Sequence, residues 1–514
     1  MTTTAVDSCL FDKWTKEIEE ARKDLGIQGM SVAVVHKGEI VYAQGFGKRN
    51  DTDPFTPETL SSIASITKGF TAAAIGELVA KKMAKWDVPV CEYLPEFQLR
   101  DRQLTLELTF IDLLSHRTGF PPMDLEWFHR SESRLELIQL LKHMDPIVPR
   151  RAEWIYNNIM FAVAGEAAAR IAGTTYEELV LETVTRPLGM EATGFSNKEM
   201  ANKPNHALPY TCKNFEAARR GQTQRIKLDT SYATDAPAGD MYSNAVELAR
   251  WARAIMHFGA LDGQQVLDKG GVEQLCTAYS LMNRKPRGPE FSISAYGLGL
   301  IVDQYKGHPC IRHSGSTPGY RSNLVLFPSD DLAIIHLSNN NINELVTALP
   351  YYIADDVLTL PKTRDWLFEE AVQDTSKMYK TYGAEDLADL ETHFPPQVPN
   401  KPATRDYTDF VGEYIHPMAG KLLFTLRGAG VDGRKNELTF QYREFEGALE
   451  HYHFDSFRLR MVEEAFTMAF LVTFVTGDDG SVRQCRLLRE TGSLEFTKTR
   501  VEVNVVDTTS SHEE

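Results

Sequence analysis

Residues 62–83 read SIASITKGFTAAAIGELVAKKM. Apolar residues from Phe70 onward recur at helical spacing, which predicts a helix that begins close to Ser65. Ser65 and Lys68 are three residues apart and therefore share one face of that helix. A serine hydroxyl is a poor nucleophile until a neighbouring group takes its proton, and an amine one turn away can help to do so. Because Ser-x-x-Lys also arises by chance, the rest of the chain decides its meaning.

Length and charge limit the classes of protein to consider. The 514 residues exceed what one hydrophobic core usually supports, so two or more domains are expected. With 42% hydrophobic and 25% charged residues, the composition is that of a globular protein. The formal net charge of −16, without any block of Lys and Arg, argues against a nucleic-acid partner.

The chain start and the cysteines indicate a cytoplasmic protein. The first 26 residues contain no basic segment followed by an apolar one, so no signal peptide is predicted. No apolar run reaches the roughly 18 residues that a membrane span needs, and no membrane association is expected. The six cysteines are scattered without a C-x-x-C pair, which indicates buried thiols rather than a disulfide framework or a zinc site.

The order of predicted elements indicates an α/β or α+β domain over residues 1–360. An amphipathic helix at 12–25 precedes a β-hairpin at 31–43, and residues 105–190 are mainly helical. Short strands return at 295–339, with residues 311–322 expected to form a loop between them. A hairpin near the start and strands near the end predict one sheet completed by both ends of this region.

The pattern changes after residue 360. Residues 361–405 predict a charged helical segment followed by a proline-rich linker. Residues 406–505 contain short β-type runs at even spacing, which predict a small all-β barrel domain. The final residues, 506–514, are expected to be disordered.

Three polar clusters could meet in space: Ser65/Lys68, Tyr156–Asn158 in EWIYNNIMF, and residues 313–316 in IRHSGSTPGYRS. In this chain order they resemble the Ser-x-x-Lys, Tyr-x-Asn and Lys-Thr-Gly (or His-x-Gly) motifs of the serine β-lactamase and penicillin-binding-protein superfamily. The similarity spans residues 12–360 and points to the branch of class C β-lactamases, D-aminopeptidases and related esterases. It implies an antiparallel sheet flanked by helices, plus a helical subdomain. The region 406–500 is similar to the lipocalin-like domain often appended to these enzymes.

The resemblance implies roles for the catalytic residues. Ser65 would be the nucleophile that forms an acyl-enzyme. Lys68 and Tyr156 together would supply the general base, and the assignment to one of them stays open. A tyrosine needs nearby positive charge to lower its pKa from about 10, and Lys68, together with His313 if that residue is protonated, could supply it.

The same resemblance implies a set of substrate-binding groups. Asn158 would orient Lys68 and the substrate, and residues 313–315 (His313, Ser314 and Gly315) would line the substrate site. The backbone N–H groups of Ser65 and Ser316 would form the oxyanion hole. No metal and no organic cofactor is implied.

Two stretches imitate these motifs. Tyr242-Ser243-Asn244 also fits Tyr-x-Asn, but it is expected to be a loop entering a helix, with Ser243 as the helix cap. Arg117-Thr118-Gly119 imitates Lys-Thr-Gly but precedes the tyrosine motif. His116 and Arg117 are expected to be structural. Ser65 itself could be a plain helix cap, and only the other motifs favour a nucleophile.

The third motif begins with His313 where related β-lactamases usually have lysine. A histidine is mostly neutral at pH 7, so weak carboxylate recognition and little β-lactamase activity are expected. The sequence therefore predicts a serine hydrolase acting on a small ester or amide. An acyltransferase, a D-aminopeptidase and a catalytically silent scaffold are the alternatives. The only other expected partner is a further copy of the chain, since a homo-oligomer is compatible with the sequence.

Overall fold

The computed structural model describes residues 8–130, 132–230, 232–382, 391–428, 437–465 and 467–499. These residues divide into two compact units. The first holds the described residues from 8 to 382 together with 464–465, and the second holds the remainder. The predicted tail at 506–514 lies outside the described residues, and the boundaries at 360 and 405 stay predictions.

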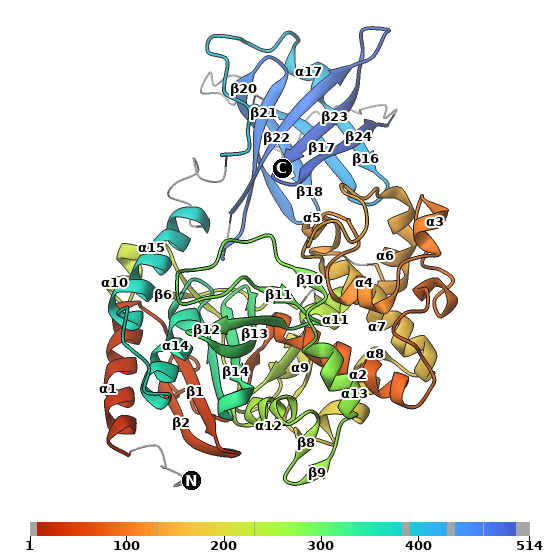
Figure 1. Ribbon diagram of the computed structural model, residues 1–514. Helices are drawn as coiled ribbons and strands as arrows, with labels where there is room; N and C mark the ends of the chain where they lie inside the picture. The colour runs from red at the N-terminus through yellow and green to blue at the C-terminus, as the bar shows by residue number, and fades with distance from the viewer. Residues whose placement is uncertain are drawn as a thin grey trace, which may run out of the picture. The chain divides into compact units, whose positions relative to one another are not determined.

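The first unit is built on an antiparallel sheet of eight strands within its described residues, in the order β10-β11-β12-β13-β14-β15-β1-β2 (Figure 1). Strand β1 comes from the start of the unit and pairs with β15 near its end, with Val32 opposite His336. The prediction that both ends of this region complete one sheet is confirmed. The strand bounds are β1 (Gly29–His36), β2 (Glu39–Gly47), β10 (Ser280–Leu281), β11 (Ala295–Tyr296), β12 (Ile301–Tyr305), β13 (His308–Thr317), β14 (Tyr320–Phe327) and β15 (Leu332–Ser338).

Two turns show how well the chain pattern predicts strands. The expected hairpin is present as β1 and β2, and its turn residues Lys37 and Gly38 have φ values of 54° and 79°. The expectation of a loop at 311–322 is wrong, because these residues form most of β13 and the start of β14 around a turn at Gly319. Small polar residues have low strand propensity, but the surrounding sheet overrides it.

Helices cover both faces of this sheet. Helices α1 (Ser8–Asp24) and α14 (Leu345–Val357) share a core with Val32 and Val34 of β1. Alternate residues of a strand face opposite sides, so Ala33 and Val35 face the side that α12 (Ala245–Met256) covers. The other described helices of this unit are α2 (Thr67–Ala80), α3 (Arg102–Thr105), α4 (Phe110–Leu114), α5 (Asp124–Trp127), α6 (Arg134–Leu140), α7 (Asn158–Ala172), α8 (Tyr176–Val180), α9 (Asn197–Met200), α10 (Phe215–Arg219), α11 (Ala236–Gly239), α13 (Lys269–Leu275) and α15 (Ala371–Tyr382).

Short strands connect these helices. They form small pairings apart from the main sheet: β3 (Ser61–Ser62), β4 (Gly194–Phe195), β5 (Tyr210–Cys212), β6 (Thr223–Arg225), β7 (Met241–Ser243), β8 (Ala260–Leu261) and β9 (Gln264–Gln265). The helices from α3 to α8 lie between β3 and β4 in the chain, which confirms the predicted helical part of this unit.

The second unit is an all-β domain, as predicted. Its strands follow the order β19-β18-β17-β16-β24-β23-β22-β21-β20. The two end strands of this sheet are consecutive in the chain and separated by Leu449 alone, so the sheet curls into a nearly closed barrel. The bounds are α17 (Tyr407–Phe410), β16 (Gly412–His416), β17 (Gly420–Arg427), β18 (Glu437–Tyr442), β19 (Phe445–Ala448), β20 (Glu450–His453), β21 (Ser456–Val462), β22 (Thr467–Thr476), β23 (Val482–Arg489) and β24 (Gly492–Lys498).

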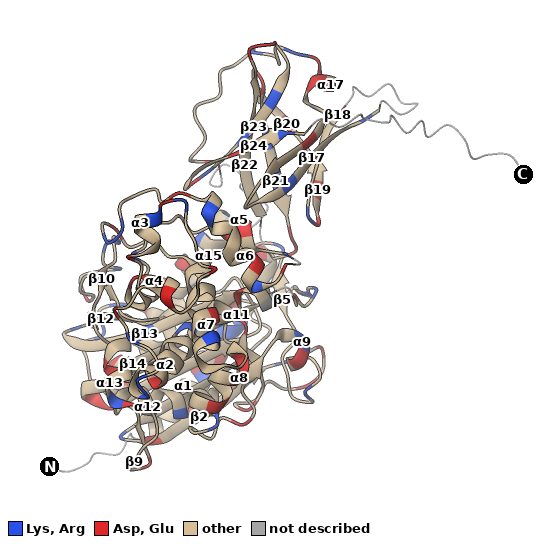
Figure 2. Cartoon of the chain, turned by 90° about the vertical axis from the view of Figure 1, so that its right-hand side faces the viewer, with Lys and Arg blue, Asp and Glu red and all other residues tan. Residues whose placement is uncertain are grey.

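The described surface carries charges of both signs. Figure 2 shows Lys and Arg mixed with Asp and Glu along the elements of the first unit. Within the described part of the chain, no helix has both the length and the apolar character needed to cross a membrane.

Candidate active site

Ser65 lies in a single 3-10 turn, η1 (Ala64–Ile66), directly before α2. Ser322 of β14 donates a hydrogen bond of 2.8 Å from its hydroxyl to the carbonyl of Ile63. A Cβ placed on Gly315 of β13 would lie 2.3 Å from that same carbonyl oxygen. Glycine is therefore required at position 315, because β13 approaches the Ser65 turn too closely for any side chain.

Lys68 is fully buried one turn after Ser65. Its Nζ lies 3.0 Å from Ser65 Oγ, 2.8 Å from Asn158 Oδ1 and 2.8 Å from the carbonyl oxygen of Ala238. A neutral amine has two N–H donors and one lone pair. With Asn158 and Ala238 accepting both donors, the lone pair faces the Ser65 hydroxyl.

Burial lowers the pKa of the Lys68 amine from 10.5 to about 7. The carboxyl groups of Asp235 and Asp124 oppose this shift. A substantial fraction of Lys68 is therefore neutral near pH 7 and able to accept a proton.

Tyr156 completes the contacts around the nucleophile. Its hydroxyl donates a hydrogen bond of 2.8 Å to Ser65 Oγ. Burial raises the pKa of this phenol well above 10, and the hydrogen bond to Ser65 only partly offsets the effect. Tyr156 thus carries its proton at neutral pH, contrary to the expectation that nearby positive charge lowers its pKa.

His313 is neutral rather than cationic. Its Nδ1 lies 2.7 Å from the carbonyl oxygen of Ser314, which can only accept, so Nδ1 carries the proton. Nε2 then accepts a hydrogen bond of 2.8 Å from the Tyr296 hydroxyl. Burial lowers the pKa of His313 to about 3, with the Lys68 charge acting in the same direction. The expectation that a protonated His313 supplies charge to Tyr156 is therefore wrong.

Strand β13 presents its residues alternately. His313 and Gly315 are buried, whereas Ser314 and Ser316 are exposed, as the period of a strand requires. The contacts of residues 313–315 with a substrate stay predictions, as does the oxyanion hole formed by the backbone N–H groups of Ser65 and Ser316.

His116 was expected to be structural, and it holds the segment that carries Tyr156. Its Nδ1 accepts a hydrogen bond of 3.1 Å from the backbone N–H of Asn157. Its carbonyl oxygen accepts a second, of 2.8 Å, from the N–H of Ile155. The imidazole centroid is 4.3 Å from that of the Tyr156 ring, so His116 fixes both neighbours of Tyr156 and packs on the residue itself. The sequence shows only that His116 follows the run 111–114, and its full burial appears in the structure.

In the alternative Tyr-x-Asn sequence, the tyrosine hydroxyl bonds to a glutamate and not to Ser65. Tyr242 belongs to β7, is 1% exposed, and donates its hydroxyl proton to Glu199 at 2.8 Å. The helix that follows is capped by Asn244, whose side chain accepts from the N–H of Glu247, so the expectation that Ser243 is the cap is wrong. Asparagine and serine are similarly good caps, and the sequence did not separate them.

The alternative Lys-Thr-Gly sequence is also structural. The Arg117 guanidinium donates to the buried carboxylate of Asp112 at 2.7 Å, and Arg151 donates to the same carboxylate at 2.7 Å. These two ion pairs join residues 112–117 to Arg151, just before Tyr156 in the chain. Removing one partner of a buried ion pair is costly, so these contacts stabilise this part of the structure.

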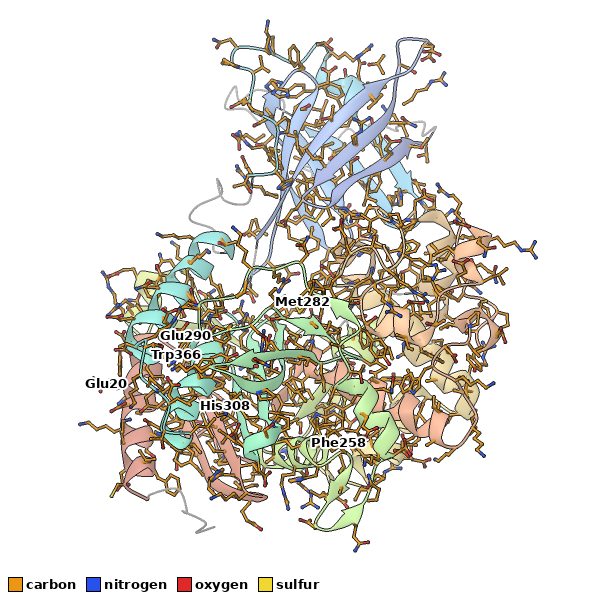
Figure 3. All side chains as sticks on the ribbon, viewed as in Figure 1. Glu20, Phe258, Met282, Glu290, His308 and Trp366 are labelled. Carbon is orange, nitrogen blue, oxygen red and sulfur yellow. The ribbon has the colours of Figure 1, made fainter. Side chains whose placement is uncertain are left out.

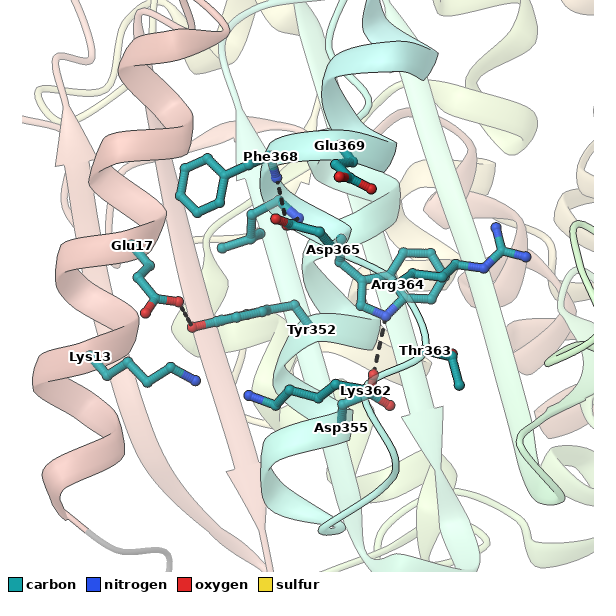
Figure 4. A pocket seen from close by; sticks show the side chains of 12 residues that line it. Lys13, Glu17, Tyr352, Asp355, Lys362, Thr363, Arg364, Asp365, Phe368 and Glu369 are labelled. Carbon is teal, nitrogen blue, oxygen red and sulfur yellow. Dashed lines mark hydrogen bonds between the residues drawn. The ribbon is translucent and has the colours of Figure 1, made fainter.

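A cavity of about 590 Å³ opens elsewhere in the first unit, among α1, α14 and the turn η7 (Trp366–Glu370) (Figure 4). The Tyr352 hydroxyl donates to Glu17 at 2.6 Å across it. None of the predicted catalytic residues lines this cavity, which therefore is separate from the Ser65 site.

Comparison with known proteins agrees with the fold. The beta-lactamase family model matches residues 14–358, and the chain belongs to this family. Residues 396–503 match a domain of unknown function, DUF3471.

The named relatives agree with this family, and the solved structures agree with the fold. The chain is 27% identical over 406 residues to unguisins hydrolase ungD' of Aspergillus campestris, covering 76% of this chain and 73% of that one. The octameric penicillin-binding protein homologue of Pyrococcus abyssi has a TM-score of 0.59 at 21% identity, covering 94% of this chain and 99% of its own. A D-stereospecific amidohydrolase of Streptomyces sp. has a TM-score of 0.52 at 21% identity, covering 64% of this chain and 94% of its own. Hydrolases are thus among the relatives, and the chain is a member of a serine β-lactamase-like hydrolase family.

Proposed function

We propose that this protein is a serine hydrolase that forms an acyl-enzyme at Ser65 on a small ester or amide. One observation carries the proposal: Ser65 Oγ lies within hydrogen-bond distance of both Lys68 Nζ, at 3.0 Å, and Tyr156 Oη, at 2.8 Å. A nucleophile next to a base that is itself held in place by further groups is the arrangement that activates a hydroxyl. A plain helix cap needs neither of these partners.

The contacts assign the proton transfers. Neutral Lys68 takes the proton of Ser65 as Oγ bonds to the substrate carbonyl carbon, and the carbonyl oxygen becomes an oxyanion facing the N–H groups of Ser65 and Ser316. When the oxyanion collapses, the leaving group departs with its bonding pair and takes the hydroxyl proton of Tyr156. Lys68 returns its proton to Tyr156. A water molecule then releases the acyl group through the same transfers, and Ser65 recovers its proton.

Two observations support the substrate class. Neutral His313 provides no charge for a carboxylate beside β13, which disfavours β-lactams. The two relatives named as a hydrolase and an amidohydrolase are consistent with cleavage of an amide. An ester with a good leaving group needs less protonation by Tyr156 and is therefore the simpler first substrate.

The test is rapid-mixing kinetics with p-nitrophenyl acetate. We expect a burst of p-nitrophenolate equal to the enzyme concentration, followed by slower turnover, and both must disappear in Ser65→Ala. Ser61→Ala is the matched control, because Ser61 is buried nearby in the sequence and its hydroxyl has no partner among the described residues. Unchanged turnover in a folded Ser65→Ala variant would refute the proposal.

Acyl transfer and D-aminopeptidase activity use the same acyl-enzyme and differ in the molecule that accepts or carries the acyl group. Adding an amine acceptor to the ester assay distinguishes transfer from hydrolysis by the product formed. Comparing D- and L-alanine p-nitroanilide tests the stereochemical alternative, which the name of the Streptomyces relative suggests. A silent scaffold predicts no burst with any of them. Self-association stays a prediction, which the octameric Pyrococcus homologue makes worth measuring.

A further inference from the structure

The segment between β10 and β11 carries an arginine that forms no ion pair with an acidic residue in the described part of the chain. Arg284 is exposed, and no hydrogen bond or ion pair joins its guanidinium to any described residue. Arg287, three residues further on, is paired with Asp374 at 2.8 Å. In a chain with 71 acidic and 55 basic residues, an arginine side chain that has no carboxylate partner is available to bind an anion from outside.

Arg284 is held over the face of a tryptophan. Its guanidinium carbon is 4.9 Å from the centroid of the Trp154 ring, within the distance of a cation–π contact. Stacking of this kind restricts the side chain without using its N–H donors. The five donors of the planar fork therefore remain free to meet a carboxylate.

Trp154 connects this arginine to the Ser65 site. Its ring centroid is 6.0 Å from that of Tyr156 and 5.8 Å from that of Tyr296. Met282, which Figure 3 labels beside β10, packs with Tyr296 in the same apolar cluster. The Arg284 charge reaches the site, since it acts to lower the pKa of Tyr156 against the larger effect of burial. One aromatic ring thus separates the unpaired guanidinium from the tyrosine that contacts Ser65.

The other cationic candidates at the site are not available for an anion. Lys68 is fully buried and its Nζ already contacts three acceptors. His313 is neutral and hydrogen-bonded at both ring nitrogens. An anionic group on a substrate that reaches Ser65 therefore finds its complementary charge beside Trp154 and not beside β13.

We propose that Arg284, stacked on Trp154, binds a carboxylate group carried by the ester or amide that is cleaved at Ser65. The inference rests on the proposed function, because it concerns the substrate of that same site. It adds a specificity-determining residue and a substrate class: acyl compounds with a free carboxylate a few bonds from the scissile group. A bidentate guanidinium–carboxylate contact lowers KM for such substrates relative to neutral ones of the same shape.

The test compares pairs of substrates in which one member carries a carboxylate and the other carries a neutral group at the same position. The p-nitrophenyl monoester of adipic acid is compared with the same ester whose second carboxyl is methylated, which places the anion on the acyl side. para-Acetoxybenzoate is compared with para-acetoxybenzamide, which places it on the leaving group. In at least one pair we expect kcat/KM of the wild type to favour the anion about tenfold, with the preference falling as salt is raised.

Variants assign the preference to the residue. Arg284→Gln is expected to bring the kcat/KM ratio of the favoured pair to about one, whereas Arg287→Gln, the matched control, keeps it. Equal kcat/KM within both pairs for the wild type, or a preference that survives Arg284→Gln, overturns the inference while leaving Ser65 chemistry intact. If the wild type cleaves none of these esters, the proposed function fails, and the inference fails with it.

Discussion

Replacing His116 by phenylalanine tests whether the Ile155–Asn157 backbone positions Tyr156 for catalysis. The new ring keeps the aromatic packing against Tyr156, where the centroids are now 4.3 Å apart. It removes the Nδ1 acceptor that holds the Asn157 N–H at 3.1 Å. The carbonyl of residue 116, which accepts from Ile155, is unchanged by the substitution. The variant therefore changes one buried hydrogen bond next to Tyr156.

The size of the effect follows from burial. Asn157 is fully buried, so its N–H would lose its partner without gaining water, at a cost of about 1–3 kcal/mol in the free energy of unfolding. We expect the backbone at Asn157 to shift until this N–H finds another partner, and this shift also displaces the hydroxyl of Tyr156. A displacement of about 1 Å at a catalytic group can cost on the order of 100-fold in rate, so we expect kcat to fall roughly 10- to 100-fold. KM is expected to stay within about threefold, because binding groups are untouched.

The assay measures kcat per active site, with the burst amplitude of p-nitrophenolate counting the sites, and urea denaturation measures stability separately. His336→Phe is the matched control. His336 is fully buried in β15, and neither of its ring nitrogens has a partner in the described part of the chain. Because the His336 ring makes no hydrogen bond to a described residue that the substitution would remove, that variant is expected to keep kcat per titrated site.

A double-mutant cycle separates positioning from general damage. If His116 acts through Tyr156, then adding His116→Phe to Tyr156→Phe should lower the residual kcat by less than about twofold. Equal loss in both backgrounds, or wild-type kcat per site in His116→Phe, would refute the reasoning.

Three further predictions follow from the site. Tyr156→Phe should lower kcat about 100-fold or more, and Tyr242→Phe should not, as steady-state assays of both variants will show. Because the pKa of Lys68 is lowered to about 7, kcat/KM should rise with pH and level off above that value. Lys68 also binds a proton more weakly in the folded protein than in the unfolded chain, so its contribution to the free energy of unfolding rises from pH 7 towards pH 10. Lys68→Met should abolish both pH dependences. Gly315→Ala should push β13 away from the Ser65 turn, since its Cβ would lie 2.3 Å from the carbonyl oxygen of Ile63. Urea denaturation should show a loss of about 1–3 kcal/mol in the free energy of unfolding, and the burst of p-nitrophenolate should disappear.

The sequence predicts the frame of the first unit because its strands are strongly apolar. Residues of β1 and β15 are nearly all buried, and such runs resemble strands whatever surrounds them. Strand β13 was expected to be partly a loop, because it contains His313, Ser314 and Gly315. These residues form a strand because β13 pairs with β14, and the small Gly315 lets β13 pack closely against the Ser65 turn.

Some features of the candidate site were also predicted from the sequence, and others were not. Ser65, Lys68, Tyr156 and Asn158 were predicted from motifs that resemble those of a known superfamily, and their side chains lie within hydrogen-bond distance of one another in the structure. The carbonyl of Ala238 was not predicted, because a backbone acceptor leaves no trace in residue type. The protonation states of Lys68 and Tyr156 were also not predicted, since their pKa shifts depend on how deeply each group is buried.

The most direct measurement is the intact mass of the protein after incubation with a fluorophosphonate, for the wild type and for Ser65→Ala. The account predicts one covalent adduct per chain on the wild type and none on the variant. Prior incubation with a slowly released ester should block the adduct. A folded wild type that takes no adduct, or an adduct that persists in Ser65→Ala, would contradict the assignment of Ser65 as the nucleophile.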